Sequence, residues 1–215
     1  AAAPKILGSP YNYQEITATG NWTKPSNAET GDKVYVQVVG GGGGGARDSG
    51  GLGDYPSGGA GGGGVLFNID DIDLLGATEG CTIGAGGSGT TGASTSGSDG
   101  GLTIFSNSAT SNLFYVRAFG GGGGDPNSGL PGIVGSIDWR GTGSVDELTN
   151  TIWAGAKGAF IQADKSAVYG AAGGSGRGAT GNEYGGFSQF AGNGGDSLSS
   201  GDGTLADGSF PGGGG

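Results

Sequence analysis

The chain has 215 residues, 58 of them glycine, and it carries a formal net charge of −10 with no histidine. Such an acidic chain repels phosphate backbones and anionic lipid, which argues against nucleic-acid and membrane-surface binding. Disorder, collagen and membrane insertion are disfavoured as well, because 33% of the residues are hydrophobic, glycine keeps no third-position period and no apolar run approaches the roughly 20 residues of a membrane span.

The first predicted strands are joined to runs of glycine. Residues 1–24 read as a lead-in or attachment segment, in which YNYQEITAT is the one plausible strand, and KPSNAETGD then makes a turn. The β-branched residues at 34–39 predict a strand that continues directly into six glycines, 40–45. A second glycine-rich run, 58–64, ends directly in the strand-like VLFNI.

The later part of the chain repeats this arrangement. Strands are expected within TEGCTIGAGGSG, at LTIF and at LFYVRAF, and the last of these leads into glycines 120–124. A long insert with less glycine follows at 125–169. No segment has a convincing helical period. We therefore place one glycine-rich domain at residues 25–215, with essentially no α-helix.

The order of strands and glycine runs gives each run a direction. If the strands form a common β body, the run at 40–45 leaves it and the run at 58–64 returns to it. The insert at 46–57 then lies at the far tip. The same reasoning makes 120–124 an outgoing run and places the 125–169 insert, or most of it, at that tip.

Bare glycine backbone can pack against itself. In the threefold extended helix, polyglycine II, no N–H or C=O bonds internally, so neighbouring helices can bond to one another and satisfy their buried polar groups. We predict a mostly β fold with little regular secondary structure, in which a small β body continues into a bundle of packed polyglycine II helices. The structural glycines are predicted to be Gly41, Gly42, Gly43, Gly44, Gly121, Gly122 and Gly123. Disordered linkers are the alternative, because glycine loses the most backbone entropy when it is ordered.

The strands and glycine runs together resemble a known family. GNWTKPSNAETGDKVYVQVVGGGGGGA, GGAGGGGVLF, CTIGAGGSG and GGLTIF are similar to the glycine-rich domains at the ends of bacteriophage tail fibres. The architecture is also similar to the receptor-recognising adhesins of T-even-type long tail fibres, which pack polyglycine helices and present variable loops at the distal end. Those adhesins carry a sizeable N-terminal docking domain, whereas some twenty residues precede the domain here, so the mode of attachment is left open.

The resemblance implies a binding protein of the virion, in a tail fibre or spike outside the cell. Its partners would be a protein or glycan of the bacterial outer surface and other virion fibre proteins, and a homotrimer is one assembly that the sequence leaves open. The predicted receptor-binding residues of the distal loops are Tyr55, Trp139, Arg140 and Trp153, because aromatic rings and arginine supply most binding hot spots. A local core within the long insert is an equal alternative for the two tryptophans.

Motifs for catalysis or cofactor binding are weak. Histidine, the common general base and metal ligand, is absent. GAGGSG (84–89) matches a dinucleotide fingerprint only as glycine background, AGNGGDSLS (191–199) is one imperfect calcium-binding repeat, and NIDDID (68–73) lacks the spacing of an EF-hand. Cys81 is read as a small buried residue. We therefore expect no enzyme activity and no cofactor or metal.

Two other functions are compatible with a glycine-rich bundle. An ice-binding protein could use such a scaffold, but the aromatic inserts at 46–57 and 125–169 interrupt the flat, regular face that ice requires. A purely structural component of a virion spike is the third alternative.

Overall fold

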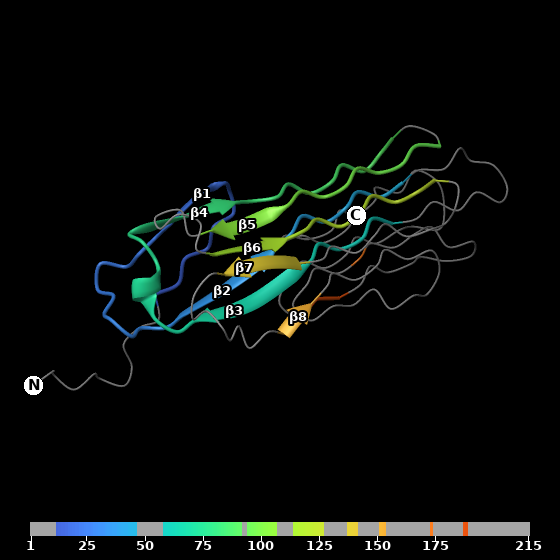
Figure 1. Ribbon diagram of the computed structural model, residues 1–215. Coiled ribbons are helices and arrows are strands. Elements are labelled where there is room, and N and C mark those ends of the chain that lie inside the picture. The colour runs from blue at the N-terminus through green and yellow to red at the C-terminus, as the bar shows by residue number, and fades with distance from the viewer. Residues whose placement is uncertain are drawn as a thin grey trace, which may run out of the picture.

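Figure 1 shows the computed structural model of the chain. The structure describes residues 12–46, 58–91, 94–106, 114–126, 137–141, 151–153, 173 and 187–188. Within these residues it contains eight β-strands, one short 3-10 helix and no α-helix. The prediction of a mostly β fold with little regular secondary structure is thus confirmed for the described part of the chain.

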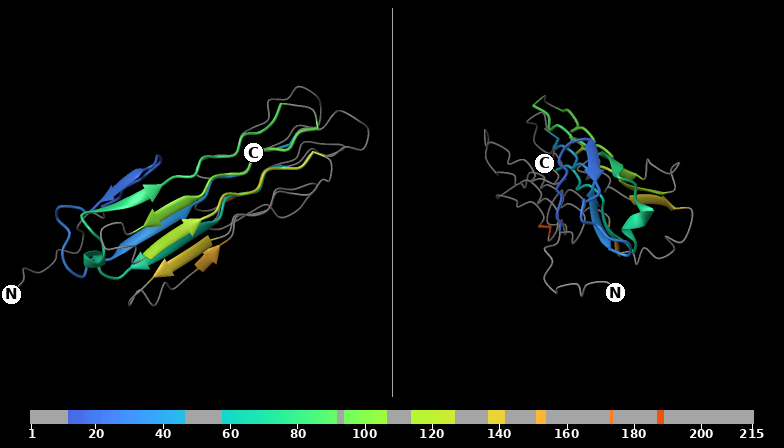
Figure 2. Two further views of the ribbon diagram at one scale, coloured as in Figure 1. Left: turned by 45° about the horizontal axis from the view of Figure 1, so that its top comes forward. Right: turned by 90° about the vertical axis from the view of Figure 1, so that its left-hand side faces the viewer.

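The strands form two antiparallel sheets, seen side-on and end-on in Figure 2. The larger sheet has the order β1 (Gly20–Thr23), β4 (Thr78–Thr82), β5 (Thr103–Ser106), β6 (Phe114–Ala118) and β7 (Ile137–Gly141). The smaller sheet has the order β2 (Val34–Val39), β3 (Gly64–Ile69) and β8 (Thr151–Trp153). The 3-10 helix η1 (Ile72–Leu74) follows β3.

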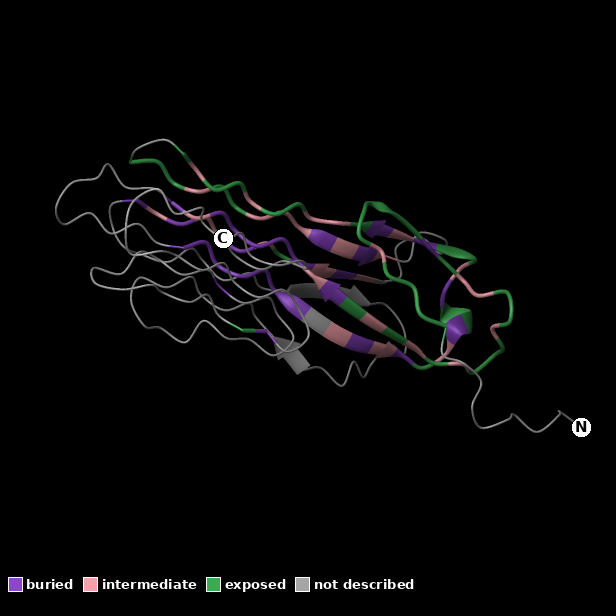
Figure 3. Cartoon of the chain, turned by 180° about the vertical axis from the view of Figure 1, so that it is seen from behind, coloured by how far each residue is buried: buried purple, intermediate pink, exposed green. Residues whose placement is uncertain are grey.

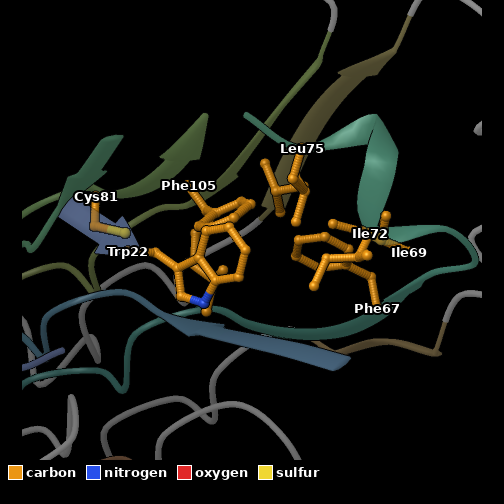
Figure 4. Close-up of a cluster of buried hydrophobic side chains, with 10 residues drawn as sticks. Trp22, Phe67, Ile69, Ile72, Leu75, Cys81 and Phe105 are labelled. Atoms are coloured by element: carbon orange, nitrogen blue, oxygen red, sulfur yellow. The ribbon is translucent and has the colours of Figure 1, made fainter. Parts of the chain in front are cut away.

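The two sheets enclose a small hydrophobic core (Figure 4). Every second side chain along a strand points into this core. In β5, for example, Thr103 and Phe105 are buried while Ile104 and Ser106 are partly exposed. The rings of Phe67 and Phe105, from opposite sheets, have centroids 6.0 Å apart. The buried members of the core are Trp22, Val38, Phe67, Ile69, Ile72, Leu75, Cys81, Phe105, Val116 and Ala118.

Five glycine-rich segments, which we call legs A to E, extend from one end of this β body. Leg A (residues 40–46) continues β2, leg C (84–91) continues β4, and leg E (119–126) continues β6. Leg B (58–63) leads into β3, and leg D (94–101) leads toward β5. Figures 1 and 2 show the legs running alongside one another away from the sheets.

Leg A is hydrogen-bonded to all four other legs, and every set of bonds repeats after three residues. The N–H groups of leg A donate to leg B (Gly40 to Gly63 O, Gly43 to Ala60 O) and to leg D (Gly41 to Gly101 O, Gly44 to Ser98 O). Its carbonyls accept from leg C (Gly87 to Gly42 O, Thr90 to Gly45 O) and from leg E (Gly121 to Gly41 O, Gly124 to Gly44 O). Three residues is the period of a threefold extended helix. The assignment of polyglycine II to the legs stays a prediction, which this period supports.

Glycine is required at several positions of the legs because other backbones lie where a Cβ atom would be. A Cβ at Gly43 would stand 2.1 Å from Gly122 O, and one at Gly121 would stand 1.9 Å from Ala60 O. Leg A is buried along most of its length, as the purple trace in Figure 3 shows. Interiors require paired N–H and C=O groups, and the bonds between legs provide that pairing without a sheet ladder.

The first strand lies later in the sequence than expected. The described part of YNYQEITAT has no strand, and β1 is formed instead by residues 20–23, which pair with β4. Trp22 of β1 is buried in the core, and Ile16 packs against it. A boundary after residue 24 therefore divides the larger sheet, because the segment read as a lead-in contributes one of its strands.

Candidate functional site

The far end of the legs, remote from the sheets, is the candidate binding end. Legs A and B are antiparallel, since Gly40 bonds to Gly63 near the body and Gly43 bonds to Ala60 farther out. Ala46 and Gly58 therefore stand at the far end, and the chain between them, 47–57, leaves and rejoins the bundle there. Legs C and D are likewise antiparallel, so residues 92–93 connect them at the same end.

The structure describes the backbone of three of the four predicted receptor-binding residues and places all three in the β body. Tyr55 belongs to the far-end segment 47–57 and lies outside the described residues. Trp139 and Arg140 are in β7, where they stand opposite Val116 and Tyr115 of β6. Trp153 is in β8, opposite Gly64 of β3. The three later residues are thus in strands of the β body.

The expectation that most of residues 125–169 lie at the tip is therefore wrong for residues 137–141 and 151–153. Leg E runs outward to residue 126, but Ile137 already pairs with Ala118 at the base of that leg. The exposed edge of β6 offers a hydrogen-bonding partner that the local sequence does not reveal. A role for Trp139, Arg140 and Trp153 in binding stays a prediction, but these residues are not in distal loops.

The opposite end of the β body carries an acidic turn. Asp71 accepts hydrogen bonds from the N–H groups of Asp73 (2.9 Å) and Gly31 (3.1 Å), which lowers the pKa of its carboxyl group. Lys33 Nζ lies 2.9 Å from Asp70 Oδ1. This contact is the first cause of a lowered pKa at Asp70 and of a raised pKa at Lys33.

These contacts make NIDDID a structural turn. Asp71 caps η1 and ties it to the turn at Gly31, whose φ of +84° favours glycine. Thr30 Oγ1 donates to Asp73 Oδ2 over 2.7 Å, which adds a second link between the same two segments. Within the described residues, no group of three or more histidine, cysteine or acidic side chains is placed to hold a metal ion.

Two buried side chains of β4 are also explained by the fold. Glu79 is fully buried, and its Oε1 accepts a hydrogen bond of 2.6 Å from the N–H of Gly76. Cys81 belongs to the core, and desolvation by burial raises the pKa of its thiol. A thiol in this state is a poor nucleophile, so the reading of Cys81 as a small buried residue agrees with its position.

Comparison with known proteins identifies the family of the chain. A family profile described as "Glycine-rich domain" matches residues 15–215. The chain belongs to this glycine-rich domain family. The curated proteins contain no match to it. The profile match begins before β1, in agreement with a domain that includes residues 20–23. In the part of the glycine-rich domain that the structure describes, no helix is long and apolar enough to cross a bilayer.

The seven predicted structural glycines of this glycine-rich domain each bond to another leg. Three side chains that were not predicted from the sequence also bond to a leg or to its base. Gly123 N–H donates to Asp99 Oδ1 over 2.8 Å. At the bases of the legs, Gly84 N–H donates to Thr103 Oγ1 and Ile83 N–H donates to Thr19 Oγ1. Small polar residues beside glycine runs are the only signal that could have indicated this capping.

Proposed function

We propose that this glycine-rich domain is the receptor-recognising tip of a bacteriophage tail fibre, which binds a protein or glycan on the bacterial surface. The observation that carries the proposal is the bundle of legs, which brings the ends of segment 47–57 and of the 92–93 connection together at one end, away from the β body. The sequence resemblance to tail-fibre tip domains supplies the biological setting.

Several properties of the bundle suit this role. Adhesive loops need a support that does not yield when a receptor pulls on them, and loops held on a rigid scaffold tolerate changes of sequence. Leg A is anchored on four sides by backbone hydrogen bonds that involve no side chain of the loops. A substitution in segment 47–57 would therefore alter recognition without removing a bond between the legs.

The proposed contact residues are those of segment 47–57, with Tyr55 as the aromatic anchor. Arg47 and Asp54 in the same segment offer charged hydrogen-bonding groups. Tyrosine and arginine bury a large area and keep groups that can form hydrogen bonds, which suits contact with a protein loop or with the face of a sugar ring. We propose a binder rather than an enzyme because the sequence offers no histidine and no assignable pair of catalytic carboxylates.

The test is the adsorption of labelled protein to a panel of bacterial strains. Tyr55→Ala, and replacement of residues 47–57 by a glycine-serine segment of equal length, should each reduce binding to a strain that the unaltered protein recognises. Tyr35→Ala is the matched control, because Tyr35 is 68% exposed on β2 and lies on the β body. Undiminished adsorption by the loop replacement would place recognition elsewhere. Activity in an ice-recrystallisation assay, without cell binding, would reject the proposal in favour of an ice-binding protein.

A further inference from the structure

Leg C has a hydrogen-bonding edge that no described part of the chain covers. Its inward groups are paired: Gly87 and Thr90 donate to leg A, and the carbonyls of Ala85 and Ser88 accept from leg D. The N–H groups of Ala85, Gly86, Ser88 and Gly89, and the carbonyls of the two glycines, have no hydrogen-bond partner among the described residues. All four residues are exposed, and Figure 3 shows this outer leg largely in green.

Within the described residues, the strand that pairs with β4 turns away before it reaches leg C. β1 covers the side of β4 only as far as Gly20, which is opposite Cys81. The backbone bends at residues 18–19, and the side chain of Gln14 then bonds back to Thr23 O (2.8 Å). The described segment before β1, residues 12–19, therefore runs back along β1 and does not continue beside leg C, so no described residue bonds to this edge.

Contacts with the described residues do not account for the glycines on this edge. Among the described residues, the nearest atom would lie 4.0 Å from a Cβ at Gly86 and 3.8 Å from a Cβ at Gly89. The other exposed row of leg C carries the side chains of Ala85 and Ser88. Glycine in an ordered segment costs about 0.5–1 kcal/mol relative to alanine, so its use at both positions indicates that another backbone comes close to them.

We infer that the outer edge of leg C is a self-association surface, on which a second copy of this chain docks through the same edge. A partner must offer bare backbone whose polar groups repeat every three residues, and leg C itself meets that requirement. Both orientations of pairing already occur inside the chain: legs A and C are parallel, and legs A and B are antiparallel. Leg C has no charged residue, so the two edges can meet without opposed charges although each chain carries −10. This inference does not depend on the proposed receptor-binding function.

The test is sedimentation velocity of the full chain over a range of protein concentrations. We expect a reversible equilibrium between the 20.4 kDa monomer and a larger species. Gly86→Val combined with Gly89→Val should weaken association by at least about tenfold, because Cβ branches would hold the second backbone beyond hydrogen-bond distance from several groups. The matched control is Ala85→Val with Ser88→Val, which adds similar bulk to the neighbouring row and should have a smaller effect.

The outcomes separate cleanly. Added salt should strengthen association, because the contact is uncharged and salt screens the repulsion between two acidic chains. A monomer at every concentration, weakening by salt, or equal effects of the two double variants would each overturn the inference. Thermal unfolding of the variants, expected to be close to that of the unaltered chain, excludes misfolding as the cause of a lost association.

Discussion

Replacing Gly43 by alanine perturbs the packing of the legs at one defined place. The added Cβ would lie 2.1 Å from Gly122 O, 2.5 Å from Gly122 C and 2.8 Å from Gly121 O, all of them backbone atoms. Ordinary van der Waals contact begins near 3.4 Å. Legs A and E would therefore have to separate by about 1.3 Å, and no side chain can rotate to relieve the clash.

The loss in the free energy of unfolding follows from the hydrogen bonds that this separation stretches. Legs A and E are joined by the bonds from Gly121 N–H to Gly41 O and from Gly124 N–H to Gly44 O, both 2.9 Å long. Each bond contributes about 0.5–1.5 kcal/mol net, and overpacking adds about 1–3 kcal/mol of strain. Together they predict a loss of about 2–6 kcal/mol, against a usual total stability of about 5–15 kcal/mol. For a domain of this size the midpoint of thermal unfolding should fall by roughly 10 °C.

The assay is urea unfolding of Gly43→Ala and of the matched variant Gly86→Ala. Among the described residues, no atom lies nearer than 4.0 Å to a Cβ at Gly86. Gly86→Ala should therefore leave the free energy of unfolding unchanged or raise it by about 0.4–1 kcal/mol through the unfolded chain. If both variants unfold at the same urea concentration as the unaltered chain, the legs are not closely packed and the reasoning fails.

Three further predictions concern the β body. Trp22→Ala should lower the free energy of unfolding by about 3–5 kcal/mol in urea titration, since Trp22 is 9% exposed and lies in the core. If it lowers this free energy by less than replacement of an exposed tyrosine by alanine does, β1 is not part of the folded domain. Because its pKa is lowered, Asp71 contributes to stability above its ordinary pKa of 3.8, and this contribution disappears as the pH falls through the pKa of the folded state. Asp71→Asn should therefore make the loss of stability at acidic pH less steep. An unchanged dependence of stability on acidic pH would contradict this. Cys81 should react with a thiol reagent only after unfolding, because burial raises its pKa; rapid labelling of the native protein would refute this.

The sequence indicated much of the β body and the direction of the first legs. β2 and β6 were predictable because their β-branched and aromatic residues stand directly before glycine runs. The return of leg B into β3 followed from the order of run and strand. The sequence could not fix which leg lies beside which, because one glycine is like another and the hydrogen bonds alone set the register.

Two elements were misplaced because their partners decide their structure. Residues 20–23 have weaker strand propensity than the segment before them, yet pairing with β4 and burial of Trp22 make them the strand. β7 lies in an insert with few local signals, and the open edge of β6 determines its position. The far-end position of the insert at 46–57 was inferred from the direction of its flanking glycine runs, and contact by Tyr55 stays a prediction.

Hydrogen exchange of the glycine amides tests the packed bundle most directly. The N–H groups of Gly43 and Gly44 donate to Ala60 O and Ser98 O inside the bundle, while those of Gly86 and Gly89 have no partner in the described part of the chain. We predict that exchange at the first pair is slowed by about three orders of magnitude or more relative to an unstructured peptide, and that at the second pair, measured at a concentration where the chain is monomeric, it is much less slowed. Rapid exchange at all four amides would contradict the account.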